Sequence, residues 1–336
     1  MKEAYLYKKL ENQNVQCQNC AHYCIIKAGA RGICGVRQNI DGKLYALNYG
    51  KAVSCQIDPV EKKPLFHFLP GRMTLSIATA GCNFACANCQ NYSISQEPKK
   101  MAQLPGENFP PEQVIAAAQE NNLPSISYTY VEPTIFSEYA LDTMKLARNA
   151  GLKNIWVSNG FMSSECQQMI FPFLDADNID IKSFSDEFYK NYCGGRLQAV
   201  LDTAIAAKKA GIWLEITTLI IPTLSDDKKM LKEIAEFIVK ELGKETPWHI
   251  SRFFGDISWK LKHLPPTPLA TLKMTYNLAK EAGLLYVYVG NAPGTTLENT
   301  LCPQCGALCI ERHGYDIIRY DKSGKCPQCS TTLNIL

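Results

Sequence analysis

Cysteine is the residue type in this sequence with the clearest capacity for metal chemistry. The chain has 15 cysteines among 336 residues. Eleven of them form three spaced groups: Cys17-x2-Cys20-x3-Cys24-x9-Cys34, Cys82-x3-Cys86-x2-Cys89 and Cys302-x2-Cys305-x20-Cys326-x2-Cys329. Isolated cysteines such as Cys55, Cys166 and Cys193 suit the role of small buried hydrophobes. We expect the grouped thiols to bind metals, because disulfides rarely persist in a reducing compartment.

The middle group supplies three thiolates directly after a predicted strand. Three thiolates can bind three irons of a 4Fe-4S cluster and leave the fourth iron open, whereas an electron-transfer cluster takes four cysteines. A zinc ion held by Cys82, Cys86 and Cys89 is the alternative, although catalytic zinc more often recruits histidine or a carboxylate. The group therefore favours a cluster with an open coordination site.

The C-terminal group has two Cys-Pro-Gln-Cys knuckles, the spacing of a zinc ribbon. Cys302, Cys305, Cys326 and Cys329 would surround one tetrahedral ion, with a hairpin over residues 310–321. Zinc is the first choice, and rubredoxin-like iron uses the same geometry. Cys309 lies beside this group as a bystander.

The N-terminal group is less diagnostic. Cys17, Cys20, Cys24 and Cys34 lie in a loop-like, glycine-bearing segment, and their spacing allows either zinc or an auxiliary iron–sulfur cluster. Zinc is slightly favoured. Simple burial of four cysteines in eighteen residues is the remaining alternative.

The segment between the last two groups alternates short β-rich runs with longer helical patterns, which predicts repeated βα units and a parallel sheet. The expected strands are Met73–Thr79, Ser125–Tyr130, Asn154–Ser158, Asn178–Ile181, Trp213–Leu219, Trp248–Arg252 and Tyr286–Val289. The expected helices are Pro111–Asn121, Phe136–Ala150, Arg196–Ala210, Asp226–Leu242 and Pro268–Ala282. We predict an α/β fold with a full or partial (β/α) barrel. The expected domains are a Cys-rich segment (1–72), the barrel (73–290) and a zinc-ribbon or rubredoxin-like module with four cysteine ligands (291–336).

Active sites of such barrels lie at the C-terminal ends of the strands. Polar residues gather at or near these ends, and we predict that they bind a cofactor: Glu132, Ser158, Asn159, Asp180, Lys182, Glu215, Thr217 and Arg252. Two of them have simpler alternatives. Lys182 could be a surface lysine paired with Asp180, and Glu132 could cap the following helix.

Charge and hydropathy exclude other classes of protein. The formal net charge of +3 argues against a protein that binds nucleic acid mainly through electrostatics. No run of 18 apolar residues is present, and the N-terminus lacks an apolar stretch followed by a cleavage site. We therefore expect a cytoplasmic protein without a membrane partner.

Residues 70 to 291 resemble the radical SAM superfamily, on the Cys82-x3-Cys86-x2-Cys89 motif that follows the first barrel strand. The resemblance implies that the open iron binds S-adenosylmethionine (SAM). Reductive cleavage then yields a 5′-deoxyadenosyl radical, which abstracts hydrogen from a substrate. It also implies that Glu132 contacts the methionine amino group, although the usual two glycines before it are missing. Asp180-Ile181-Lys182 resembles a segment of glycyl-radical activating enzymes such as the pyruvate formate-lyase activase.

The whole arrangement, including Asp58-Pro59-Val60-Glu61-Lys62-Lys63-Pro64 and His249-Ile250-Ser251-Arg252-Phe253, resembles the AmmeMemoRadiSam system radical SAM protein. That resemblance implies Memo-like and AMMECR-like partners and an external low-potential electron donor. It leaves the substrate open. The alternatives are activase-like modification of a protein or peptide, RNA modification in which the zinc ribbon binds the nucleic acid, and a non-catalytic metal-binding adaptor.

Overall fold

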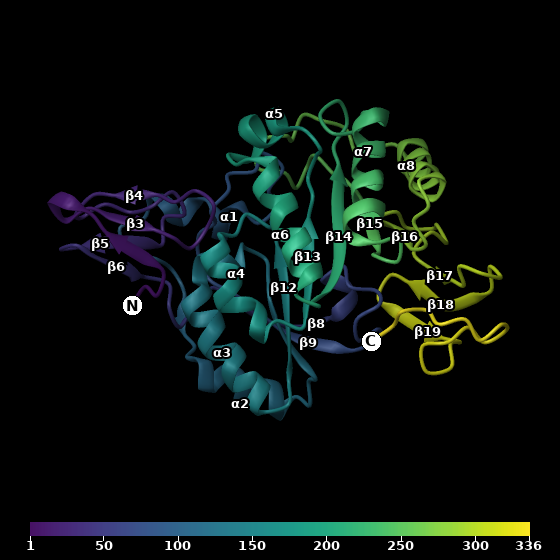
Figure 1. Ribbon diagram of the computed structural model, residues 1–336, viewed down its shortest axis with the longest axis horizontal. Coiled ribbons are helices and arrows are strands. Elements are labelled where there is room, and N and C mark those ends of the chain that lie inside the picture. The colour runs from purple at the N-terminus through teal and green to yellow at the C-terminus, as the bar shows by residue number, and fades with distance from the viewer.

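The computed structural model describes residues 1–336 and has one eight-stranded sheet at its centre (Figure 1). The strand order is β16-β15-β14-β13-β12-β11-β9-β8. Neighbours from β9 to β16 pair in parallel, and β8 pairs antiparallel with β9. The bounds are β8 Ser54–Pro59, β9 Met73–Ala78, β11 Ser125–Tyr128, β12 Lys153–Ser158, β13 Ala176–Asp180, β14 Trp213–Ile220, β15 Trp248–Arg252 and β16 Val287–Gly290. Because β8 and β16 are both edges, the barrel is partial, within the fold class predicted from the sequence.

Helices follow the parallel strands and cover the outer face of the sheet. Their bounds are α2 Pro111–Glu120, α3 Ser137–Asn149, α4 Ser164–Ile170, α6 Leu197–Lys209, α7 Lys228–Phe237 and α8 Leu269–Glu281. Two short helices, α1 Tyr92–Ser95 and α5 Asp186–Phe188, lie in loops. The helix expected over 226–242 is instead α7 followed by a π-helical turn at Ile238–Leu242. Asp227 caps α7 by accepting from Met230 N at 2.9 Å, which explains why the helix begins after it.

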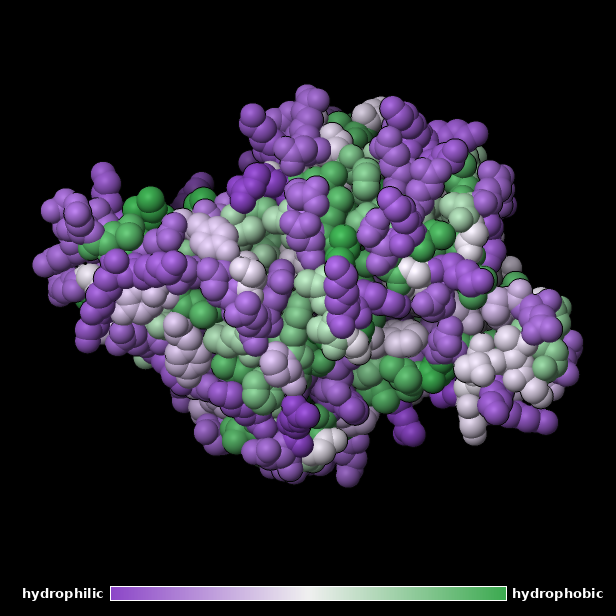
Figure 2. All heavy atoms as spheres, in the orientation of Figure 1, coloured by the Kyte–Doolittle hydropathy of each residue, from purple (hydrophilic) through white to green (hydrophobic).

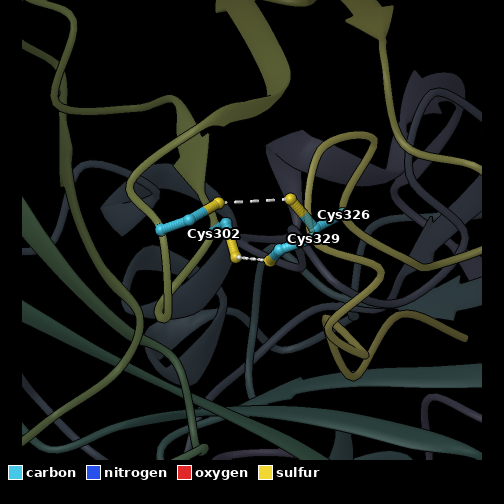
Figure 3. A group of neighbouring side chains, drawn as sticks. Cys302, Cys326 and Cys329 are labelled. Carbon is cyan, nitrogen blue, oxygen red and sulfur yellow. Dashed lines mark hydrogen bonds between the residues drawn. The ribbon is translucent and has the colours of Figure 1, made fainter.

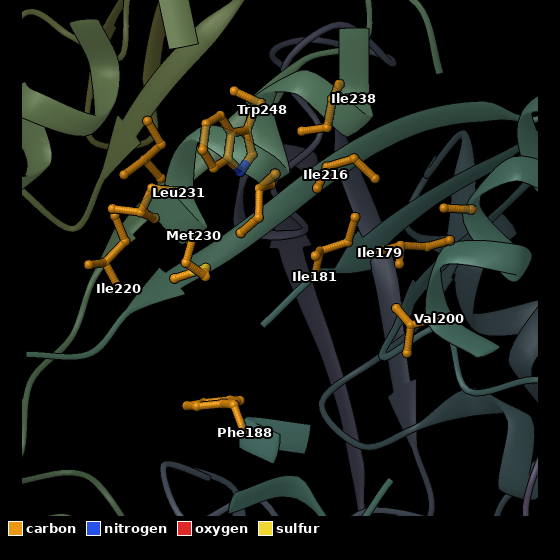
Figure 4. Packing of buried hydrophobic residues seen from close by; sticks show 14 of the residues in the cluster. Ile179, Ile181, Phe188, Val200, Ile216, Ile220, Met230, Leu231, Ile238 and Trp248 are labelled. Carbon is orange, nitrogen blue, oxygen red and sulfur yellow. The ribbon is translucent and has the colours of Figure 1, made fainter. Parts of the chain in front are cut away.

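The largest hydrophobic cluster lies between β13–β15 and the helices α6 to α8 (Figure 4). Ile179, Ile216 and Ile250 project from successive strands, and Val200, Leu231 and Ile234 face them from the helices. All six side chains are fully buried. Burial of aliphatic area on this scale stabilises the sheet strongly, at about 25 cal/mol per Å².

Two small modules lie at opposite ends of the long axis (Figure 1). The N-terminal module has two three-stranded sheets, ordered β1-β6-β5 and β2-β3-β4. Its strands are β1 Lys2–Glu3, β2 Tyr7–Lys9, β3 Val15–Cys17, β4 Ile25–Ile26, β5 Arg37–Ile40 and β6 Lys43–Ala46. A two-stranded ribbon of β7 Lys51–Ala52 and β10 Glu107–Asn108 follows.

The C-terminal module is a three-stranded antiparallel sheet of β17 Thr300–Leu301, β18 Leu308–His313 and β19 Asp316–Arg319. This module contacts Phe66 and His67, which lie in the connection between β8 and β9. Arg312 Nη2 donates to Phe66 O at 2.9 Å, and His67 Nδ1 donates to Leu333 O at 3.1 Å. The predicted domain boundary at residue 72 lies between β8 and β9. It therefore separates two strands that pair with each other in the central sheet.

No helix is long and apolar enough to cross a bilayer. On the face shown in Figure 2, hydrophilic side chains are spread over the barrel helices and both small modules.

Asp177, on β13, is a fully buried carboxyl group with neither oxygen hydrogen-bonded. Burial raises its pKa well above the usual value near 3.8, so the folded state holds this proton more tightly than the unfolded state. Stability is therefore lost as the pH rises above the unfolded pKa. We expect Asp177→Asn to raise the free energy of unfolding at pH 8 by about 1–3 kcal/mol. This gain in the free energy of unfolding should shrink toward pH 4. Denaturant unfolding of both chains at several pH values measures it. A gain that does not change with pH would contradict this account.

Candidate metal centre and cofactor site

The loop after β9 carries Cys82, Cys86 and Cys89, which are all partly buried. Phe84 N lies 3.4 Å from Cys82 Sγ, and Ser95 Oγ lies 3.4 Å from Cys89 Sγ. Both groups can donate to a thiolate, and such hydrogen bonds stabilise the charged form of sulfur. Burial raises the pKa of Cys82 and Cys89, and these two groups offset part of that rise.

Backbone hydrogen bonds hold this loop from two sides. On one side, Ala85 N donates to Cys193 O and Ala87 N donates to Tyr192 O, both at 2.8 Å. On the other, Trp259 N donates to Cys89 O at 3.0 Å. No motif in the sequence indicated that residues near 193 and 259 position the cysteine loop.

Cys193, which the sequence presented as an isolated cysteine, is fully buried. Its backbone carbonyl accepts from Ala85 N, so Cys193 lies next to the cysteine loop without being part of the three-cysteine motif.

Distances between thiols separate the C-terminal group from the other two. The Sγ atoms of Cys302, Cys305, Cys326 and Cys329 all lie within 4.8 Å of one another (Figure 3). Cys302 and Cys329 are 3.5 Å apart, and Cys305 and Cys326 are 3.6 Å apart. Zinc–sulfur bonds of about 2.3 Å place tetrahedral sulfurs about 3.8 Å apart. This group fits a single zinc or iron ion, in a zinc-ribbon-like module.

No other three cysteine, histidine or acidic side chains come as close together as these four. Cys82, Cys86 and Cys89 are not among the side chains that already converge on the position of a single ion. A 4Fe-4S cluster takes each thiolate on a different iron, so its ligands stand farther apart. The three residues fit such a cluster better than they fit zinc.

Glu132 connects the loops that follow β11 and β12. Its carboxylate accepts from Thr134 Oγ1 at 2.6 Å, Ser158 Oγ at 3.0 Å and Asn159 N at 2.7 Å. Thr134 N, at 3.1 Å, adds the helix-cap bond that the sequence allowed as an alternative. Burial raises the pKa of Glu132, and these donors offset part of that rise.

Two asparagines that we did not predict join this network to the cysteine loop. Asn159 Nδ2 donates to Asn83 Oδ1 at 2.8 Å, and Asn83 directly follows Cys82. Asn91 Nδ2 donates to Tyr130 O at 2.8 Å. Tyr130 has a φ of 64°, a left-handed conformation that favours glycine. The backbone thus adopts a glycine-type turn without the glycines, and the Tyr130 hydroxyl is anchored on Asp58.

Lys182 lies on the other side of the cysteine loop. Its Nζ donates to Asp180 at 2.8 Å. Burial lowers the pKa of Lys182, but the charges of Asp180, Cys86 and Cys193 outweigh that effect and raise it well above the usual value. Lys182 is therefore a partly buried cation, with a side chain 15% exposed, and it forms the ion pair with Asp180 that the simpler alternative named.

Three predicted cofactor residues lie apart from this network. Glu215 is only the third residue of β14, and its carboxylate accepts four hydrogen bonds, from Phe66 N, His67 N, Trp213 Nε1 and His249 Nε2. These bonds occupy the acceptor sites of the carboxylate, so the structure argues against a cofactor role. Thr217 Oγ1 donates to Asn178 Oδ1 at 2.9 Å, also within the barrel. Arg252 Nε donates to Thr267 O at 2.9 Å, at the end of β15.

The sequence pattern of the Radical SAM superfamily matches residues 76–238, which include the cysteine loop and the Glu132 network. These residues form a radical SAM superfamily domain. A full-length relative, the uncharacterized protein MJ0808 of Methanocaldococcus jannaschii, is 48% identical over all of both chains.

Activating enzymes are more distant relatives. The (2S)-3-sulfopropanediol dehydratase activating enzyme of Klebsiella oxytoca is 24% identical over 60% of this chain and 63% of its own length. The pyruvate formate-lyase-activating enzyme of Clostridium pasteurianum is 22% identical over 50% of this chain and 70% of its own. Among solved structures, Streptococcus suis SuiB bound to S-adenosylmethionine has a TM-score of 0.50 at 11% identity. It covers 69% of this chain and 53% of SuiB, and this likeness shows the shared fold.

Proposed function

We propose that this chain is a radical SAM enzyme that cleaves S-adenosylmethionine reductively and abstracts a hydrogen atom from its substrate. The observation that carries the proposal is a partly buried three-thiol loop joined to the Glu132 network through Asn83. A 4Fe-4S cluster bound there supplies a low-potential electron and an open iron for the methionine end of SAM.

The protein's own groups would then bind and orient SAM. Glu132 holds Ser158 and Asn159 at the C-terminal ends of the strands, where the ribose and the methionine amino group are expected. Lys182 places a cation beside the thiols, suited to a carboxylate. Arg252, farther along the same edge, could bind a substrate group. Buried walls exclude water that would otherwise quench a radical.

For the wider biological role, we propose the AmmeMemoRadiSam assignment, with Memo-like and AMMECR-like partners and an external low-potential electron donor. The activating enzymes named above favour a protein or peptide substrate as the second candidate. A stable complex with one of the partner proteins would support either version, since both require a protein surface close to the cysteine loop.

The decisive experiment uses the full chain purified without oxygen and reconstituted with iron and sulfide. Dithionite and SAM are added, 5′-deoxyadenosine is quantified by chromatography, and the EPR spectrum of the reduced cluster is recorded with and without SAM. We expect product and a SAM-dependent change in the spectrum. A reducible cluster that gives neither would overturn the proposal.

Glu132→Gln tests the network around the site. The amide puts a donor against groups that already donate to Glu132, so Ser158 and Asn159 should lose their positions. Hydrogen bonds to a charged group contribute about 1.5–3 kcal/mol, so we expect SAM to bind roughly 10- to 100-fold more weakly. Equilibrium dialysis on the reconstituted variant measures the dissociation constant. Glu112→Gln, on the exposed face of α2, is the matched control. Equal affinities for both variants would refute a positioning role for Glu132.

A further inference from the structure

The four N-terminal cysteines line one small cavity. Cys17, Cys20, Cys24 and Cys34 all contribute to its wall, together with His22, Arg37 and Asn83. Three of the thiols are buried and Cys24 is half-buried. The four thiols therefore form one group around a single cavity, although their sequence spacing left this open.

The thiols of this group are not packed as those of a single-ion site. The C-terminal group provides the comparison within the same molecule, since its four sulfurs all lie within 4.8 Å. The N-terminal thiols do not converge on the position of a single ion as that group does, and neither do Cys82, Cys86 and Cys89. In the arrangement of its thiols, the N-terminal group therefore resembles Cys82, Cys86 and Cys89, the three residues that fit a cluster.

We propose that Cys17, Cys20, Cys24 and Cys34 hold a second 4Fe-4S cluster, in place of the zinc that the sequence slightly favoured. A closed set of four thiolates is the usual ligand set of such a cluster. The site is additional to the SAM-cleaving centre, and its existence does not depend on the activity proposed above.

The second site lies directly against the cysteine loop of the first. Cys34 O is so close to Gly81 that a β-carbon on Gly81 would lie 2.7 Å from it, and Gly81 adjoins Cys82. His22 Nε2 contacts Asn83 O at 2.9 Å, on the other side of Cys82. Two loops from distant parts of the sequence thus meet around the same residues.

Two cations are placed to balance the charge of these thiolates. The Arg37 guanidinium lies in the wall of the N-terminal cavity, and its charge offsets part of the rise that burial causes in the pKa of Cys17. Lys99 lies between the two groups, with Nζ bonded to Phe84 O at 2.8 Å and its backbone against Gly35. Burial lowers the pKa of Lys99, and the thiolates of Cys82, Cys34, Cys86 and Cys89 counteract this. Lys99 is thus electrostatically linked to both groups.

The test uses a full chain in which the first cluster cannot form. The C82A/C86A/C89A variant is reconstituted anaerobically with ferrous iron and sulfide in the presence of zinc, and iron, sulfide and zinc are measured per chain. We expect about four irons and four sulfides to remain. The reduced variant should give an EPR signal that does not respond to SAM. In the wild type, the nearby first cluster should broaden that signal by magnetic coupling.

Two further variants identify the site. Adding C24A to the C82A/C86A/C89A variant should remove most of the remaining sulfide. The effect on folding should be small, because Cys24 is only half-buried. C302A/C305A/C326A/C329A should lose one metal ion and keep all of its sulfide. A C82A/C86A/C89A variant that binds about two zinc ions and no sulfide would overturn the second cluster while leaving the proposed SAM chemistry intact.

Discussion

Alanine at Cys82, Cys86 or Cys89 is expected to abolish formation of 5′-deoxyadenosine, with a loss of at least about 1,000-fold. Each thiolate would bind a different iron, so the loss of any one removes one of the three ligands that a site-differentiated cluster needs. Each variant should bind less iron at this loop and lose the SAM-dependent EPR change. Chromatographic quantification under dithionite measures the loss. Full turnover in any of the three variants would show that the loop is not the cluster site.

Cys193→Ala is the matched control for these variants. It is fully buried and its backbone lies against the cysteine loop, so it is the thiol outside the motif to test as a fourth ligand. We expect this variant to keep its iron and at least about half of its activity, because a three-cysteine motif leaves the fourth iron open. A collapse of iron content comparable to that of Cys86→Ala would make Cys193 a ligand and the cluster a closed one.

The second large effect is expected from Arg37→Met. Arg37 and Glu138 form an ion pair with side-chain exposures of 2% and 0%, and Arg37 Nη1 lies 2.9 Å from Glu138 Oε1. Burial alone would raise the pKa of Glu138, but the charge of Arg37 keeps it below its usual value. Removing Arg37 leaves the buried Glu138 carboxylate without its partner charge, which lowers the free energy of unfolding by about 3–5 kcal/mol. Denaturant unfolding of the metal-loaded chain measures the change.

The double variant Arg37→Met/Glu138→Leu should recover a large part of this loss, because neither charge then remains buried. Lys153→Met serves as the surface control. Lys153 pairs with Asp175 at 2.8 Å but is 52% exposed, so its loss should cost less than about 1 kcal/mol. Similar losses from Arg37→Met and Lys153→Met would contradict the assignment of Arg37–Glu138 as a buried structural pair.

Much of the barrel could be predicted because short β-rich runs alternate with longer helical patterns, several of which end just before a glycine. The strand Trp248–Arg252 has the predicted bounds, and Gly211 and Gly283 follow α6 and α8 with positive φ, as expected of helix stops. β8 was missed because an antiparallel edge strand that precedes the first βα unit has no helix to signal it.

The site was predicted less completely, because its geometry depends on contacts between distant segments. Glu132, Ser158 and Asn159 do meet, since parallel strands end at one edge of the sheet. Asn83 and Cys193 carry no local signal, and their neighbours come from other loops. Glu215 shows the limit of the strand-end rule. Its strand begins only two residues before it, so it lies deep in the barrel and bonds to incoming backbone.

The hydrogen bonds from the C-terminal module to Phe66 and His67 bear on the order in which the molecule is assembled. The paired residues are 246 and 266 positions apart in the chain. While the ribosome is still making the barrel, the Phe66 carbonyl and the His67 ring therefore have none of these partners. Contacts between such distant residues form late, because a long loop must close first. Biosynthesis of this protein should thus pass through a stage in which the central sheet has formed but the C-terminal module does not yet cover Phe66 and His67.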